Sequence, residues 1–223
     1  MSNSRLVELS HVIRAGLDTY PELPRPIITP HLTRADSVQH YAPGTSFEID
    51  VISMAGNTGT YLDSPFHRYE GGTDLAGLSL ESLVDLPAEV FSLERPASRG
   101  IRAADLQGRD LAGRAVLLHT GWDRHFATPA YANDAPYLAR DGIEYLVSQG
   151  VALVGIDSLN IDDTGPDAAG ERPAHSLLLA AGIHVVEHLT NLAALPASGS
   201  TFTAVPPLVE GFGTFPVRAF AKV

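Results

Sequence analysis

One polar segment in the first third of the chain carries residue types that proton transfer needs. Residues 57–67 read NTGTYLDSPFH, which places Asp63 four residues before His67. A carboxylate at this spacing can orient an imidazole and stabilise its charged form, which suits general acid–base catalysis. The alternative is an Asx-type turn followed by a surface histidine. Both interpretations stay open from this segment alone.

The residues around this segment indicate how it is held. Residues 47–51 alternate apolar and acidic side chains, which predicts a strand that is buried on one face and leads into the polar segment. Gly56 and Gly59 allow backbone conformations that other residues avoid, and Pro65 restricts the path of the chain. We therefore expect a rigid loop after a strand, where catalytic side chains are often held.

Short apolar runs and helical patterns define the remaining elements. Helices are predicted over residues 137–150, between Pro136 and a helix-ending Gly150, and over about 174–181. Strands outnumber helices and the two interleave, so we expect an α/β fold with a mixed, barrel-like sheet. The further predicted strands cover residues 116–118, 151–156, 183–186 and 217–223.

Composition restricts the classes of protein that fit. The 223 residues include no cysteine, which excludes disulfides, thiolate metal sites and a cysteine nucleophile. The formal net charge of −11 argues against a nucleic-acid partner. The first twenty residues lack the apolar core of a signal peptide, and no apolar stretch approaches the roughly 20 residues of a transmembrane helix. We expect one cytoplasmic domain over residues 1–223, with a small-molecule substrate and no membrane partner.

The polar segment also carries most of a known motif. In the cyclase family of metal-dependent hydrolases, which includes bacterial kynurenine formamidases and isatin hydrolases, this place reads H-x-G-T-H-x-D-x-P-x-H. The chain resembles this family nearly from end to end, which implies the swivelling β/β/α cyclase-like fold with flanking helices. The motif positions that match are Gly59, Thr60, Asp63, Pro65 and His67. Further family-like segments are HTGWD at 119–123, GIDSLNID at 155–162, AHSLLLAAGIHVVEHLTNLAAL at 174–195 and the closing FPVRAFAKV.

Two motif positions differ, and both are metal-ligand histidines in the family. Asn57 and Tyr61 replace them here. In the family, these histidines and the motif aspartate hold zinc or manganese, which activates water to attack an amide or lactam carbonyl. A neutral amide and a phenol with a pKa near 10 are weak ligands for such ions. The usual metal triad therefore cannot form in this chain.

The other site positions of the family are retained. The resemblance assigns a metal-binding carboxylate to Asp63 and the general acid–base residue to His67. In the family, a histidine and a glutamate from the C-terminal half also join the site. The resemblance places them at His175 and Glu187, which keep the family's separation of 12 residues.

Three functions are compatible with the replacements. The favoured one is an enzyme without a metal cofactor, in which His67 transfers protons with Asp63, His175 and Glu187 while Tyr61 polarises a carbonyl group during cyclisation, dehydration or ring opening. The second is an amidohydrolase of the formamidase or lactam hydrolase type, whose displaced zinc or manganese ion is held by Asp63, His175 and Glu187, with or without His67. The third is a non-catalytic homologue that binds a small molecule.

Substrate contacts and subunit contacts are predicted from other residues. Asn57 and the aromatic side chains Tyr20, Phe66 and Trp122 are candidates to line a substrate pocket, although core packing explains aromatic residues equally well. The proline-rich segment 20–30 is predicted to run extended as an arm. An extended segment cannot bury its own apolar side chains, so we expect a homodimer or homotetramer. The remaining histidines are interpreted as surface or core residues, and the pair His184 and His188 is not taken as a zinc site.

Overall fold

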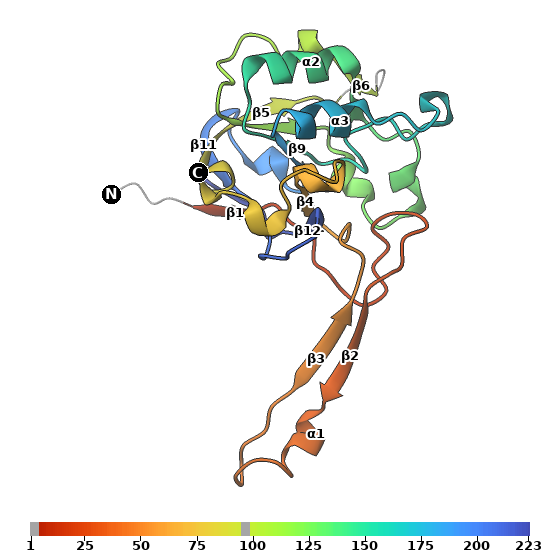
Figure 1. The fold of residues 1–223 in the computed structure, drawn as a ribbon, viewed down its shortest axis with the longest axis vertical. Helices are drawn as coiled ribbons and strands as arrows, with labels where there is room; N and C mark the ends of the chain where they lie inside the picture. Colours follow the sequence, from red (N-terminus) through yellow and green to blue (C-terminus); the bar gives the residue numbers. More distant parts are fainter. Residues whose placement is uncertain (1–4, 95–98) are drawn as a thin grey trace.

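The computed structural model describes residues 5–94 and 99–223. Its strands are β1 (Leu6–Glu8), β2 (Ile27–Leu32), β3 (Ile49–Ser53), β4 (Tyr61–Asp63), β5 (Leu86–Ser92), β6 (Gly100–Ile101), β7 (Ala115–His119), β8 (Tyr137–Leu138), β9 (Leu153–Ile156), β10 (His184–Glu187), β11 (Ser198–Thr203), β12 (Thr214–Pro216) and β13 (Phe220–Lys222). Its α-helices are α1 (Arg34–Ser37), α2 (Arg140–Gln149) and α3 (Pro173–Ala180). A body built on one large sheet carries a two-stranded arm that projects away from it (Figure 1).

The large sheet is mixed and curled. Its nine strands follow the order β1-β13-β11-β5-β7-β9-β10-β4-β12. The central strands β5, β7, β9 and β10 run parallel, whereas the flanking pairs are antiparallel. The predicted α/β class with a mixed, barrel-like sheet is confirmed.

Both faces of the central strands are covered. Val116 and Leu118 of β7 pack with Ile143 of α2 and other residues of one apolar cluster, whereas Leu117 between them belongs to a second cluster with Phe202. Helices α2 and α3 lie over the same face of the sheet (Figure 1). Burial on both faces explains why these strands appear in the sequence as continuous apolar runs.

Most predicted elements lie close to their expected places. Strands β7, β9, β10 and β13 and helix α3 fall within or beside the predicted ranges. Helix α2 begins at Arg140, three residues later than expected, because Tyr137 and Leu138 pair as β8 with β6. The backbone of Ala139 is still extended, so the helix cannot begin before it.

The alternating segment before the polar loop forms a strand, but its predicted burial is wrong. Strand β3 pairs only with β2 in the described residues, and together they form the arm. Phe47, Ile49 and Val51, which were expected to face a core, are 52%, 47% and 51% exposed. The proline-rich segment 20–30 begins with a turn, in which the amide of Leu23 donates to the carbonyl of Tyr20, and then runs into β2. Pro30 is tolerated in β2 because the arm has only two strands.

The described helices include none that combines the length and the apolar character needed to cross a membrane.

Candidate functional site

Strand pairing brings the polar segment against the C-terminal half of the chain. Strand β4 runs antiparallel to β10, which places Tyr61 opposite Glu187. On its other side β4 pairs with β12, which places Asp63 opposite Thr214. His67 ends a short 3-10 turn that follows β4. The sheet register therefore assembles residues that are more than 100 positions apart in the sequence.

Asp63, His67 and His175 form a compact group beside β4. Nε2 of His67 lies 3.8 Å from Oδ1 of Asp63, and Nε2 of His175 lies 3.5 Å from Oδ2 of the same carboxylate. One ligand atom of each residue lies within 4.8 Å of the other two. Asp63 and His175 are buried, whereas the side chain of His67 is 34% exposed. Solvent therefore reaches this group on the side of His67.

Thr214 fixes the orientation of His67. Its Oγ1 donates a hydrogen bond of 2.5 Å to Oδ1 of Asp63 and lies 2.6 Å from Nδ1 of His67. A hydroxyl group has one proton to donate, so towards His67 it accepts, and Nδ1 of that ring carries the hydrogen. In a neutral ring this leaves the lone pair of Nε2 directed at the group.

Asp162 holds His175 in the same way. Its Oδ2 lies 2.6 Å from Nδ1 of His175 and accepts from the backbone amide of that residue, and its Oδ1 accepts from the amide of Ala174. The carboxylate thus caps the first turn of α3 and orients the imidazole. Nε2 of His175 is left to face Asp63, an arrangement typical of metal-ligating histidines supported by a carboxylate.

The charges in this group favour a bound cation. Burial alone would raise the pKa of Asp63, but His175 and His67 lower it below its usual value, so the carboxylate is ionised. Burial alone would lower the pKa of His175, but its hydrogen bond to Asp162 and the nearby carboxylates of Asp63 and Glu187 raise it well above its usual value. A cation at this place, either a proton on the His175 ring or a metal ion bound at Nε2 instead of that proton, is therefore stabilised by the carboxylates of Asp162, Asp63 and Glu187.

The same group fits a divalent metal ion. Oδ2 of Asp63 is buried and has no hydrogen-bond partner among the described residues. It faces Nε2 of His175, and Nε2 of His67 lies near the other oxygen of the same carboxylate. Carboxylate oxygen and neutral imidazole nitrogen are the ligands that zinc and manganese take in proteins. The orphaned oxygen and the two oriented rings therefore present a suitable donor set.

Tyr61 occupies a buried hydrogen-bond chain beside this group. Its hydroxyl donates a hydrogen bond of 2.5 Å to Oε2 of Glu187 and lies 3.2 Å from Nε2 of His188. The other ring nitrogen of His188, Nδ1, lies 2.9 Å from the hydroxyl of Tyr131. Burial raises the pKa of both phenols well above the usual value and lowers that of His188 to about 3. All donors in the chain are therefore neutral, and Tyr131, His188 and Tyr61 donate in turn towards Glu187.

Glu187 ends this chain with a buried carboxyl group. Burial raises the pKa of Glu187 to about 7, against the opposing charge of His175. Its Oε1 accepts a 2.6 Å hydrogen bond from the amide of Ile161 and lies 3.8 Å from Nε2 of His175. The carboxyl group therefore lies between the phenol of Tyr61 and the metal-binding group.

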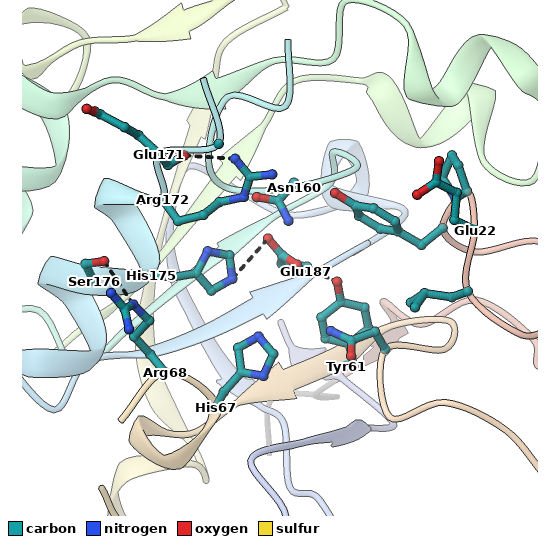
Figure 2. A pocket seen from close by; sticks show the side chains of 15 residues that line it. Glu22, Tyr61, His67, Arg68, Asn160, Glu171, Arg172, His175, Ser176 and Glu187 are labelled. Atoms are coloured by element: carbon teal, nitrogen blue, oxygen red, sulfur yellow. Dashed lines mark hydrogen bonds and ion pairs between the residues drawn. The ribbon is translucent and has the colours of Figure 1, made fainter. Parts of the chain in front are cut away.

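A cavity of about 650 Å³ opens over these residues. Figure 2 shows His67, His175, Tyr61 and Glu187 around it, with Arg172 and Asn160 above His175. This volume lies in the usual range for small-molecule sites.

The structure places the predicted substrate contacts in different surroundings. Tyr20 and Asn57 line the cavity. Phe66 lines a neighbouring depression that shares Asn57 and His67 with it. Trp122 packs against a small apolar cluster, and its Nε1 donates to the carbonyl of Tyr131, so it does not line the cavity.

Several residues of the site were missed by the sequence analysis. Asp162 was not among the predicted site residues, and His188 was interpreted only as a surface or core histidine. Thr214 and Arg172 belong to no motif that we recognised. A weak signal existed for Asp162, since it ends the family-like segment 155–162, but no feature of the sequence shows that strand β12 places Thr214 against Asp63.

Comparisons with known proteins agree with this geometry. The family model named Cyclase matches residues 7–163. Kynurenine formamidase from Geobacillus thermodenitrificans (strain NG80-2) is 34% identical over 180 residues, which cover 80% of this chain and 81% of that protein. The chain belongs to the cyclase family. The resemblance inferred from the motif is thereby confirmed.

Solved structures extend the cyclase-family likeness to the whole chain. A structure described as a potential metal-dependent hydrolase with cyclase activity is 25% identical, has a TM-score of 0.78 and covers 98% of each chain. An isatin hydrolase bound to the product analogue thioisatinate is also 25% identical, with a TM-score of 0.79 over 99% of this chain and 92% of that one. The relatives of this cyclase-family chain are thus hydrolases.

The expectation that the chain works without a metal cofactor is wrong. A related structure is described as metal-dependent, and Asp63, His67 and His175 form a group that could hold an ion. The expectation rested on the loss of the two motif histidines at Asn57 and Tyr61. The structure favours the alternative that kept a displaced ion on Asp63, His175 and Glu187, with or without His67, because the imidazoles of His67 and His175 converge on Asp63.

Proposed function

We propose that this cyclase-family hydrolase cleaves the amide or lactam bond of a small carbonyl compound with the help of one divalent metal ion. The convergence of Oδ2 of Asp63 and the Nε2 atoms of His67 and His175 is the observation that carries the proposal. The relatives named kynurenine formamidase and isatin hydrolase support an amide or a lactam as the bond that is cleaved. A zinc or manganese ion, when bound, would act as a Lewis acid and activate water.

The residues around the group would divide the remaining tasks. Asp63, His67 and His175 would hold the ion. We assign proton transfer to Glu187, because its pKa of about 7 suits exchange near neutral pH. This replaces the role expected for His67, whose Nε2 belongs to the ligand set.

Tyr61 would act through Glu187. Its phenol stays protonated and donates to Oε2 of the carboxylate, which leaves Oε1 on the side of His175. We infer that this bond orients the carboxyl group towards the scissile bond. Tyr61 is therefore a positioning residue in this proposal, and its phenol takes the place of a motif histidine without binding the ion.

We expect protein that is incubated with zinc or manganese and then desalted to retain about one ion per chain, because Asp63 and His175 are buried and both imidazoles are pre-oriented. Elemental analysis measures this directly. The metal-loaded protein should hydrolyse a formylated kynurenine-type amide or an isatin-like lactam, and a chelator should abolish the reaction. Amide hydrolysis that continues in the presence of chelator, or a protein that retains no ion, would reject the proposal.

A further inference from the structure

Arg172 presents an unpaired positive charge to the cavity. Its Nη1 donates to the backbone carbonyls of Asp163 and Glu171, at 3.2 Å and 2.8 Å. Among the described residues no carboxylate forms an ion pair with it, since Asp163 pairs with Arg99 and Glu171 with Arg140. Nε and Nη2 of the guanidinium therefore keep hydrogen-bond donors for a ligand.

Neutral donors surround this guanidinium group. Oδ1 of Asn160 accepts from the amide of Asp162, which leaves the NH₂ group of this cavity-lining residue without an acceptor in the described part of the chain. Tyr20 also lines the cavity. Burial raises the pKa of its hydroxyl to about 12, and the nearby charge of Arg172 opposes this shift. Figure 2 shows the Arg172 guanidinium beside Asn160 and above His175.

We infer that Arg172 and Asn160 form a subsite for a carboxylate group of the substrate, an inference that rests on the proposed hydrolase function. A guanidinium binds carboxylates through two parallel hydrogen bonds, and the Asn160 amide would add a third donor. Arg172 directly precedes α3 and His175 lies in the first turn of that helix, and both side chains line the same cavity. The substrate class is therefore a small organic acid whose carboxylate lies a few bonds from the amide or lactam that is cleaved.

Two probes of equal shape test this subsite by calorimetry. Metal-free, chelator-treated protein should bind benzoate about 10- to 100-fold more tightly than benzamide, since a charge-assisted hydrogen bond is worth that factor. Arg172→Gln should remove this preference and Arg172→Lys should keep part of it. The matched control is Arg68→Gln, which removes a guanidinium that lines the same cavity but is hydrogen-bonded to Oγ of Ser176. Equal binding of both probes, or a benzoate preference that survives Arg172→Gln, would overturn the subsite.

Turnover separates this inference from the proposed function. The metal-loaded protein should prefer 2-formamidobenzoate to formanilide, and Arg172→Gln should remove that preference while retaining its metal ion. Hydrolysis of both amides with no difference between them would reject the subsite and leave the hydrolase function in place. Benzoate binding that depends on Arg172 in a protein that hydrolyses neither amide would support the subsite and count against the function.

Discussion

Asp63→Asn is expected to remove the retained metal ion and to abolish hydrolysis. The substitution replaces a carboxylate whose one oxygen is held by Thr214 and whose other oxygen faces Nε2 of His175. A neutral amide is a weak ligand, and the loss should exceed the roughly 10- to 100-fold effect of removing an outer hydrogen-bond partner. Elemental analysis after desalting and single-turnover hydrolysis measure the two effects.

A carboxylate on the same cavity provides the control. Glu171→Gln removes an exposed acidic group that lines the cavity but is not part of the metal-binding group. It should keep the ion and the activity. Thermal unfolding shows that both variants are folded before the comparison is made. An Asp63→Asn protein that keeps its ion would place the metal site elsewhere.

Asp162→Asn is expected to weaken metal binding by about 10- to 100-fold, the effect typical of a lost outer partner. The native carboxylate accepts the proton of Nδ1 of His175 and leaves Nε2 as the ligand atom. An asparagine offers one oxygen where the carboxylate offers two, so its NH₂ group faces either the amide of Ala174 or the amide and Nδ1 of His175. The negative charge that holds the proton on Nδ1 is lost in both orientations, and in the second the imidazole must accept at Nδ1 and carry its proton on Nε2, which blocks the ligand position.

Calorimetric titration with zinc measures this affinity, and nitrogen NMR chemical shifts of the imidazole report its tautomer. Asp163→Asn is the matched control, because that neighbouring carboxylate binds Arg99 and the amide of Gly165 instead of a ring. Unchanged zinc affinity in Asp162→Asn, or an unchanged tautomer, would show that Asp162 only caps α3.

The sequence predicted the elements whose signals are local. The apolar runs of β7 and β9 and the end of α2 at Gly150 could be predicted, because burial on both faces and a helix-ending glycine leave short-range patterns in the sequence. The i, i+4 spacing placed Asp63 and His67 in one site. His175 and Glu187 were found only through the resemblance, since their closeness to Asp63 depends on the β4 and β10 pairing.

The remainder depended on contacts that no local pattern encodes. The alternation of residues 47–51 predicts a strand with one apolar face, but it does not specify which molecule covers that face. Thr214 reaches Asp63 through a strand pair formed 151 residues later in the chain. The metal site was misjudged because the loss of the two motif histidines was given more weight than the retained His175, which completes the donor set from α3.

The hydrogen-bond chain from Tyr131 through His188 and Tyr61 to Glu187 also bears on how this site could have evolved. Changing Tyr61 alone to histidine would leave Oε2 of Glu187 and Nε2 of His188 to find new partners in a buried place, at a cost of about 1–3 kcal/mol for each unsatisfied group. Restoring a histidine at Asn57 alone would add only one of the two missing ligands. Passage between the two kinds of site therefore requires coordinated substitutions, so a lineage that has acquired the tyrosine is held there by epistasis.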